Sequence, residues 1–592
     1  MSSVAQQRAT TANRVGAAGS RPGQRSAFWI VVTVVAFVSV FILPFLFPLK
    51  VPVFSPVYTA GGNNRVGAML AAAVSMVTAL LCWRFGFYPQ PAAMPQAQRR
   101  PEDLRWILGA GLVVALATAV LGVPMATKGV FYGDAGYFLT QLRSGLVLHG
   151  RLYRDFEFAY GPLLYAWPAL FVRVLAPLHV SAAMAYVVSL CAMELVGTAM
   201  LFYTARALPM RRGMQLTAFL VLCVVTLDPQ LGLNYTAFRF ICSITSLVVL
   251  SRQVRPGRAA ATAALCAVVN FAVSPEMGVA FVAGACALCA YRASTAGVRW
   301  LLPAAAALAG AGLFSALVGP DYFRTLKEFA SGGYSMLLEP APHIYFLLLC
   351  AIGLAPTVAA TVLADRASRD RAPVNGLLLG TFVAGLALLP AALGRCDPLH
   401  VSFNGLPLFL LSFVALDRCR LPVRRVGVVL ALLFTVYCVA QEYALNLGGL
   451  KTLAGREVDW PNDADLPRLS RVLGKNQVSF PWNTTLRLAD QLAARGQYHP
   501  LYLCIGPVDD AAERRLVAEV RQADYALSPN RLGLVNENKI NNSGMRFRLR
   551  FGYRYREKRE PHLQGALMLQ ELQANWRRVD TFGEYDLYRK VR

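Results

Sequence analysis

The chain has 592 residues, of which 56% are hydrophobic and only 15% are charged, and its mean hydropathy is +0.44. Soluble globular proteins carry about a quarter charged residues, so this composition excludes an ordinary soluble enzyme. It also excludes a disordered chain, because such chains are poor in apolar residues. The formal net charge is nevertheless +25, from 58 Lys and Arg against 33 Asp and Glu. Basic residues in a membrane protein first set its orientation, so the placement of this charge is the first question.

Apolar stretches predict about thirteen membrane spans, since a spanning helix needs about 20 mostly apolar residues. The predicted spans are 27–48, 66–83, 106–124, 180–205, 214–229, 237–251, 259–273, 276–291, 300–318, 343–363, 375–393, 401–416 and 426–446. Several are short, and the pair 259–273 and 276–291 could also be one broken helix pair or a re-entrant hairpin. We therefore expect a mostly α-helical, polytopic membrane bundle. Its first apolar stretch is long enough to span and indicates a signal anchor rather than a cleavable signal peptide.

Arginines indicate which ends of these spans are cytoplasmic. If the N-terminal tail, residues 1–26, is cytoplasmic, alternation of the spans places 23 arginines in cytoplasmic segments. These segments are the tail and the loops 84–105, 206–213, 252–258, 292–299, 364–374 and 417–425. Every cytoplasmic loop then obeys the positive-inside rule. We expect an integral membrane protein of a bacterial inner or plasma membrane, with its C-terminus outside.

Three segments lie on the outer side in this topology. The predicted transmembrane domain covers 27–446. Two of the three segments belong to it, a long loop at about 125–179 and a medium loop at about 319–342, and the third is the polar segment 447–592. The last should form a small extracytoplasmic α/β domain, because strand and helix patterns alternate along it. The predicted strands are Leu501–Gly506, Tyr525–Ser528 and Tyr585–Arg589, and the predicted helix is Asp509–Ala523.

The long outer loop combines carboxylates, arginines and aromatic residues. Its polar and aromatic side chains include Asp134, Tyr137, Tyr153, Arg154, Asp155, Glu157 and Tyr160. Aromatic rings stack on sugars and carboxylates bind sugar hydroxyls, so this composition favours a sugar ligand. An interfacial aromatic belt with ordinary loop charges would give a similar pattern.

The arrangement of this loop resembles the first extracytoplasmic loop of GT-C superfamily glycosyltransferases, such as protein O-mannosyltransferases and lipid A aminoarabinose transferases. The resemblance is carried by Asp134 with Tyr137, by Gly150, Tyr153 and Asp155, and by Gly161-Pro162-Leu163-Leu164-Tyr165. It implies that 164–175 is an interfacial helix and not a span. It covers roughly 105–205 well, and the other spans only by topology. Two predicted spans precede the span that carries the motif, whereas many relatives have the motif after their first span; residues 27–83 could be an added pair of spans.

The resemblance also implies a reaction and roles for particular residues. The expected enzyme is a membrane glycosyltransferase that moves a hexosyl or pentosyl group, with inversion, from a polyprenyl-phosphate donor to an extracytoplasmic glycan, lipid or protein. Asp134 matches the general base, and Asp155 is a second carboxylate that orients the acceptor or shares the proton.

Other polar residues at the outer ends of the spans are candidates for the same site. Cations stabilise a departing lipid phosphate, and the candidates are Arg239, Arg395 and His400. Arg395 shares one short turn with Asp397 and His400, whereas a lone arginine such as Arg239 could equally serve a structural role. Glu157 and Glu276 are candidates for binding sugar hydroxyls.

Cofactors and alternative functions follow from what the motifs require. The sequence requires no cofactor; the acidic residues could hold a divalent cation, but no ligand spacing demands one. We expect no nucleic-acid partner. A lipid or glycan transporter or flippase, a glycan ligase or polymerase of similar topology, and a non-catalytic scaffold with the same fold are the alternatives. A transporter would place its polar groups near the bilayer midplane, in symmetric halves.

Overall fold

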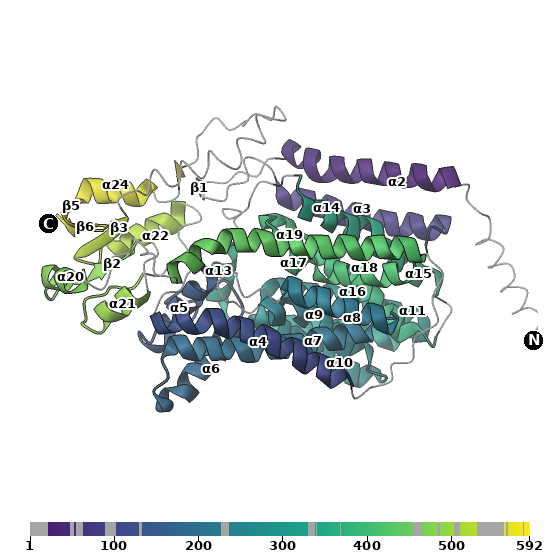
Figure 1. Cartoon of the computed structure of the whole chain (residues 1–592), viewed down its shortest axis with the longest axis horizontal. Coiled ribbons are helices and arrows are strands. Elements are labelled where there is room, and N and C mark those ends of the chain that lie inside the picture. Colours follow the sequence, from purple (N-terminus) through teal and green to yellow (C-terminus); the bar gives the residue numbers. More distant parts are fainter. Residues whose placement is uncertain are drawn as a thin grey trace, which may run out of the picture.

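A computed structural model provides the fold of the chain (Figure 1). It describes residues 22–47, 53–54, 63–88, 102–128, 133–226, 236–329, 338, 340–366, 369–453, 465–481, 486–501, 510–529, 562–563, 566–583 and 585–591. The predicted strand at Leu501–Gly506 lies almost entirely outside these residues.

Most of the described chain forms one helical bundle, in agreement with the predicted fold class (Figure 1). The bundle helices are α2 (Pro22–Phe37), α3 (Asn64–Phe85), α4 (Glu102–Lys128), α7 (Ala182–Ala207), α8 (Arg212–Thr226), α9 (Thr236–Ser251), α10 (Pro256–Val273), α11 (Pro275–Ala296), α12 (Leu301–Val318), α14 (Pro342–Leu348), α15 (Ala355–Ala364), α16 (Ala372–Arg395), α17 (Pro398–Asn404), α18 (Leu406–Asp417) and α19 (Leu421–Leu453). Short helical segments extend or join them: η1 (Val38–Ile42), η2 (Leu43–Leu46), η3 (Ala176–Leu178), η4 (Val298–Trp300) and η5 (Leu349–Leu354).

Over its described residues, each of the thirteen predicted spans falls on a helix or on consecutive helices. Among the described residues, ten segments are long and apolar enough to cross a membrane. Pro256–Val273 and Pro275–Ala296 each qualify separately by length and composition, which favours two spans over one broken pair or a re-entrant hairpin. The bend lies instead between α17 and α18, at 66°. Over their described residues, the apolar helices Arg212–Val225 and Phe238–Ser251 are shorter. At a rise of about 1.5 Å per residue, neither described segment reaches across a hydrocarbon core about 30 Å thick.

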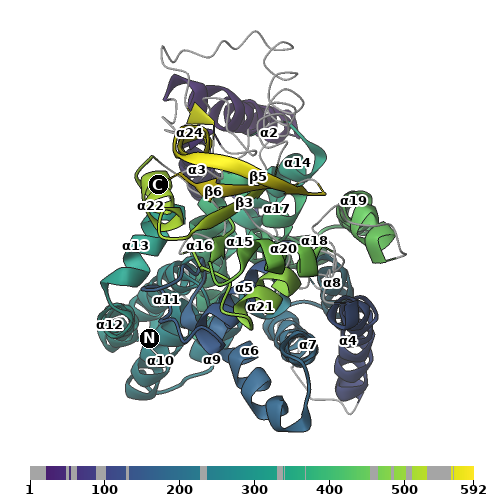
Figure 2. The same cartoon turned by 90° about the vertical axis from the view of Figure 1, so that its left-hand side faces the viewer.

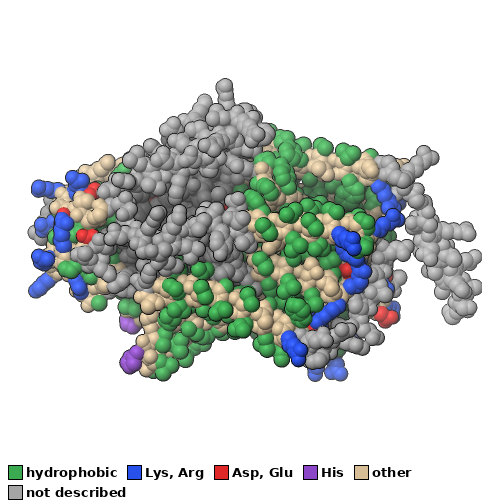
Figure 3. Space-filling model, in the orientation of Figure 1, with side chains coloured by type: hydrophobic (Ala, Val, Ile, Leu, Met, Phe, Trp, Pro, Cys, Tyr) green, Lys and Arg blue, Asp and Glu red, His purple; other side chains and the backbone are tan. Residues whose placement is uncertain are grey.

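The packing separates central from peripheral helices. In α16, 72% of the most apolar 18-residue stretch is buried inside the protein, whereas in α4 the buried share of the corresponding stretch is only 17%. Apolar side chains that are exposed on the bundle, such as Leu112 and Val113 of α4, form a surface suited to lipid tails. Figure 3 shows this hydrophobic band, with Lys and Arg gathered beyond it at both ends of the molecule.

One end of the bundle carries the arginine-rich loops, and the other carries the outer-loop helices and the C-terminal domain (Figures 1 and 3). At the arginine-rich end, Asp103 of α4 pairs with Arg206 and with Arg212, the latter at 2.5 Å. This carboxylate therefore ties α4 to the ends of α7 and α8. Within the bundle, Thr118 of α4 donates a hydrogen bond of 2.5 Å to Glu194 of α7.

The outer-loop helices lie at the opposite end. They are α5 (Gly133–Leu146), α6 (Pro162–Leu175) and α13 (Pro320–Phe329). The 14-residue α6 is too short to span, as the sequence predicts for 164–175.

The C-terminal domain is built around a four-stranded sheet with the order β2-β3-β6-β5 (Figure 2). Its strands are β2 (Val478–Ser479), β3 (Tyr525–Pro529), β5 (Trp576–Phe582) and β6 (Tyr585–Lys590), and its helices are α20 (Leu466–Leu473), α21 (Leu486–Ala493), α22 (Asp510–Val520) and α24 (Ala566–Asn575). β2 and β3 are parallel, while β6 pairs antiparallel with both β3 and β5. A separate short parallel pair joins β1 (Val53–Phe54) to β4 (His562–Leu563).

Alternation along the strands gives this domain two cores. Tyr525 and Leu527 of β3 pack with α20 and α21, whereas Ala526 packs with α22 and α24 on the other face. β3, β6 and α22 confirm the strands predicted at 525–528 and 585–589 and the predicted helix. The sequence analysis did not predict β5, α20, α21 and α24.

Replacement of Asp103 by asparagine should lower the melting temperature of the purified protein in detergent. It would leave Arg206 and Arg212 without their shared carboxylate, and loss of one partner from a buried ion pair costs about 3 kcal/mol. The matched control is Asp370→Asn, because Asp370 is exposed at the same end of the bundle. Equal melting temperatures for the two variants would contradict a stabilising role for Asp103.

Candidate functional site

The site is built first from α5 and the loop that follows it. One face of α5 is buried: Ala135, Phe138 and Leu142 share a core with Tyr186 and Leu190 of α7. Asp134 is in the first turn of α5, where the positive end of the helix dipole favours a carboxylate. The Asp134 side chain itself lies outside the described residues.

Two of the predicted tyrosines hold the loop together. The Tyr137 hydroxyl accepts a hydrogen bond from the Ala159 amide at 2.8 Å, and its ring stacks on Phe158. Tyr153 has a positive φ of 67°, and its buried hydroxyl donates to the Tyr160 carbonyl at 2.7 Å. Burial raises the pKa of Tyr153 well above its usual value. Both hydroxyls bind the loop's own backbone, and a substrate contact for these residues stays a prediction.

The charged residues of this loop divide into exposed and buried groups. Asp155 accepts hydrogen bonds from the amide and Nε of Arg151 at 2.8 and 3.0 Å, which lower the pKa of Asp155. Arg154 is also exposed, whereas Glu157 is only 2% exposed. A carboxylate with a lowered pKa is a weaker proton acceptor, so this environment favours an orienting role for Asp155.

Gly161 fixes the loop against the bundle. Its amide donates to the Val273 carbonyl at the end of α10, at 3.1 Å. A Cβ at this position would lie 2.2 Å from the Ala272 carbonyl oxygen, so only glycine permits this close approach. The Gly-Pro motif therefore has a physical reason: the glycine docks the loop, and Pro162 begins α6, where a missing amide proton costs nothing.

Docking of the loop brings together three predicted residues from distant segments. The Arg239 guanidinium of α9 lies 4.3 Å from the ring centroid of Tyr160 and 4.6 Å from that of Phe240. It forms an ion pair with Glu276, in the first turn of α11, and its Nε lies 3.4 Å from the Ser274 hydroxyl. The result is an oriented cation held between two rings and a carboxylate.

Tyr322 of α13 extends this cluster, although the sequence analysis did not identify it. Its ring contacts that of Tyr153 with a centroid distance of 5.0 Å, and Arg324 donates to the Tyr153 carbonyl at 3.0 Å. The Tyr322 side chain is 1% exposed, and its hydroxyl has no hydrogen-bond partner among the described residues. Burial, followed by the charge of Glu276, raises the pKa of Tyr322.

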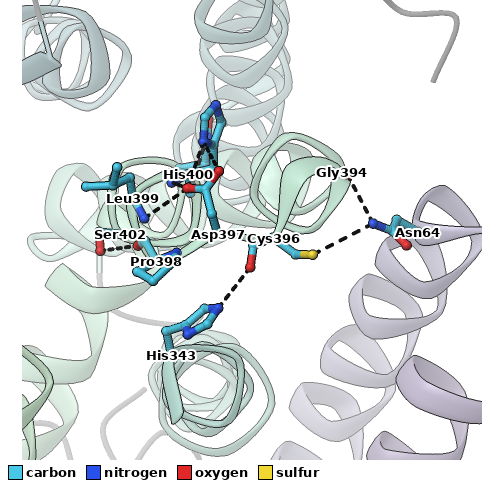
Figure 4. A network of polar contacts seen from close by, with 10 residues as sticks. Asn64, His343, Gly394, Cys396, Asp397, Pro398, Leu399, His400 and Ser402 are labelled. Atoms are coloured by element: carbon cyan, nitrogen blue, oxygen red, sulfur yellow. Dashed lines mark hydrogen bonds and ion pairs between the residues drawn. The ribbon is translucent and has the colours of Figure 1, made fainter. Parts of the chain in front are cut away.

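A second polar group surrounds the turn that joins α16 to α17 (Figure 4). Asp397 caps α17 by accepting from the Leu399 and His400 amides at 3.1 and 2.9 Å, and it pairs with His400 Nδ1 at 2.9 Å. Arg395 is the last residue of α16, and its side chain lies outside the described residues. Asp397 and His400 are thus brought together as the sequence predicts.

Two residues that the sequence analysis missed hold this turn. Asn64 donates to the Leu393 and Gly394 carbonyls at 2.8 and 3.0 Å, and His343 Nε2 lies 2.8 Å from the Cys396 carbonyl oxygen (Figure 4). Cys396 has a left-handed φ of 46°, a conformation that is costly for residues other than glycine. Contacts from α3 and α14 therefore stabilise the end of α16, and neither lies near the turn in sequence.

Stacked rings join the two polar groups. Phe240, which carries the Arg239 guanidinium on its face, stacks on Phe403 of α17 with a centroid distance of 5.0 Å. Both groups therefore belong to one neighbourhood at the end of the bundle that carries the C-terminal domain. Across the described part of the chain, no three His, Cys, Asp or Glu side chains are grouped to hold a metal ion.

Similarity to known proteins was found at the level of structure. No family model matches the chain. No curated protein matches it significantly. The chain is similar to the mycobacterial arabinofuranosyltransferase AftD, at 16% identity and a TM-score of 0.42, over 85% of this chain and 41% of AftD. It therefore spans about two-fifths of that protein's length.

Two further solved structures are similar over most of the chain. ArnT from Cupriavidus metallidurans, bound to undecaprenyl phosphate, matches at 12% identity and a TM-score of 0.43, over 83% of this chain and 99% of ArnT. The oligosaccharyltransferase AglB from Archaeoglobus fulgidus, in complex with an inhibitory peptide and a dolichol-phosphate, matches at 9% identity and a TM-score of 0.43, over 83% of this chain and 75% of AglB.

Replacement of Arg239 by lysine should reduce activity about tenfold or more, because lysine keeps the charge but loses the guanidinium that lies over the Tyr160 and Phe240 rings. Sugar transfer, the activity that the sequence leads us to expect, is measured in membrane preparations and corrected for protein amount. Arg252→Lys is the matched control, since Arg252 stacks on Tyr203 at 4.2 Å at the arginine-rich end. Wild-type activity in Arg239→Lys would refute a role for the stacked guanidinium.

Replacement of Asn64 by leucine should lower both stability and turnover. Two carbonyls at the end of α16 would lose their donor, at a cost of about 1–3 kcal/mol, and the turn would shift. Asn375→Leu removes comparable buried bonds, to Tyr291 and Asp365, at the other end of the bundle. We expect similar melting temperatures for the two variants but lower turnover per folded molecule only for Asn64→Leu. Equal turnover would show that Asn64 serves stability alone.

Proposed function

We propose that this protein is a GT-C-type membrane glycosyltransferase that takes a sugar from a polyprenyl-phosphate donor at the outer face of the membrane. The observation that carries the proposal is the group formed by Arg239, Glu276 and Tyr160. It unites a cation, a carboxylate and an aromatic face directly beside the loop with the GT-C-like motif. These are the groups that a sugar phosphate requires for binding.

The membrane location suits such a donor. The lipid tail of such a donor would lie in the bilayer and its phosphate would emerge at the surface; the position of the polar cluster at helix ends of the bundle supports this arrangement. The planar guanidinium of Arg239 matches phosphate geometry, and Glu276 fixes its orientation. Tyr160 presents a ring to the same region, and Glu276, Glu157 and Asp397 are the proposed partners of sugar hydroxyls.

The reaction follows from these roles. The Asp134 carboxylate accepts the proton of the acceptor hydroxyl, and the acceptor oxygen attacks the anomeric carbon. The bond from that carbon to the phosphate oxygen breaks, its electron pair leaves with the polyprenyl phosphate, and the anomeric configuration inverts. Arg239, Arg395 and His400 stabilise the charge that develops on the phosphate. Asp155 orients the acceptor, and Tyr137, Tyr153 and Arg154 complete the binding surface of the loop.

The placement of the polar groups favours this function over transport. A transporter binds its substrate near the bilayer midplane, at broken helices. Here the described polar clusters lie at helix ends, and Glu194, within a span, is bonded to Thr118. The proposed topology has the arginine-rich end in the cytoplasm and the C-terminal domain outside. A glycan ligase or polymerase would use the same donor and differs only in the size of the transferred group.

The decisive variant is Asp134→Asn, assayed with polyprenyl-phosphate-linked sugars in membranes. Loss of a general base should reduce turnover by about 10²-fold or more while donor binding remains, since asparagine keeps the size of the side chain. Asp370→Asn, exposed at the other end of the bundle, should retain wild-type activity. Full glycan-modifying activity in Asp134→Asn would reject Asp134 as the base. An inactive wild type with every such donor would reject the proposed function.

A further inference from the structure

Helix α5 lies between the membrane bundle and the C-terminal domain. One face packs on α7, as described above, and α21 of the C-terminal domain lies beside it in both views (Figures 1 and 2). The C-terminal domain therefore touches the helix on which Asp134 is found, although the sequence gives this domain no role in the site.

The contact is centred on Arg143 and Tyr498. Arg143 is in the last turn of α5, is only 7% exposed, and its guanidinium carbon lies 4.6 Å from the centroid of the Tyr498 ring. A cation on an aromatic face is attracted by the ring quadrupole, and the attraction strengthens when both groups are shielded from water. At the end of a helix, a cation also interacts favourably with the helix dipole.

Tyr498 is firmly attached to its own domain. The neighbouring residues form two backbone bonds with Val478 of β2: Val478 donates to the Gln497 carbonyl and His499 donates to the Val478 carbonyl, both at 2.9 Å. The Tyr498 ring also packs on Phe480, with a centroid distance of 5.4 Å. The backbone on both sides of Tyr498 is therefore hydrogen-bonded to the sheet, and its ring is held in place by packing.

A helix transmits a constraint along its length. Arg143 and Asp134 are nine residues apart in the sequence, which corresponds to about 13 Å along the axis of α5. Because backbone hydrogen bonds make a short helix nearly rigid, anchoring its last turn also fixes the direction in which its first turn points.

We propose that the C-terminal domain positions the catalytic helix α5 through the contact of Arg143 with Tyr498. Arg143 and Tyr498 are positioning residues, since they act on Asp134 through the helix. The proposal rests on the proposed function for its kinetic readout, but its structural readout does not need a substrate.

The test compares Tyr498→Leu with Tyr498→Phe in the full-length protein in detergent. Hydrogen exchange of residues 135–146 reports on α5, and sugar transfer reports on turnover. Tyr498→Leu removes the aromatic face, so it should speed exchange in α5 and lower kcat about tenfold while the donor KM stays within about twofold. Tyr498→Phe keeps the ring and should restore both values. Arg143→Gln should reproduce the effect of Tyr498→Leu.

A matched control separates positioning from general stability. Tyr203→Leu removes the ring beneath Arg252 at the arginine-rich end and should leave exchange in α5 unchanged. The proposal is overturned if Tyr498→Leu leaves α5 exchange at the wild-type level, or if Tyr203→Leu has the same effect on it. If the wild type transfers no sugar from any polyprenyl-phosphate donor, the proposed function fails, and the exchange measurement alone decides on the contact.

Discussion

The ion pair of Arg239 and Glu276 is the interaction on which the end of the bundle nearest the C-terminal domain depends. The two residues belong to different helices, α9 and α11, and the pair fixes the guanidinium between Tyr160 and Phe240. A lone cation at the end of a membrane bundle would extend toward lipid headgroups. The ion pair instead holds the guanidinium within the bundle. There it lies against Tyr160 of the first loop and against Phe240, and Phe403 of α17 stacks on Phe240.

The same constraint explains how the neighbouring turn is built. The end of a helix leaves carbonyl groups without partners, and inside a bundle water cannot supply them. Asn64 supplies donors to two such carbonyls of α16, and His343 contacts the carbonyl of Cys396, the residue that follows the helix. Helix α3 therefore has a structural role at this site, because its first residue supports the turn that presents Asp397 and His400.

The distribution of charge separates orientation from chemistry. Twenty-three arginines lie in the segments predicted to be cytoplasmic, and in the structure such residues are tied to acids such as Asp103 and Asp417. At the end of the bundle that carries the C-terminal domain, the charges on the helix ends and in the loop with the GT-C-like motif are few, and they are the ones that meet aromatic rings and buried tyrosines. A large positive net charge on an apolar chain thus reflects topology, and the proposed chemistry depends on a handful of residues.

The sequence alone determined the helical, membrane-bundle fold class and the approximate positions of its helices, because apolar runs are local patterns; it predicted thirteen spans, and ten described segments are long and apolar enough to cross a membrane. It also indicated the turn at Asp397 and His400, whose members are three residues apart. Only the tertiary structure decided that Arg239 meets Tyr160 and Glu276, that Asn64 and His343 support α16, and that Tyr498 reaches α5. These contacts join residues on different helices or domains, and helix packing rather than sequence spacing sets the distances between them. The short strands and amphipathic helices of the C-terminal domain were only partly predicted for the same reason, since its two cores form only when the sheet is assembled.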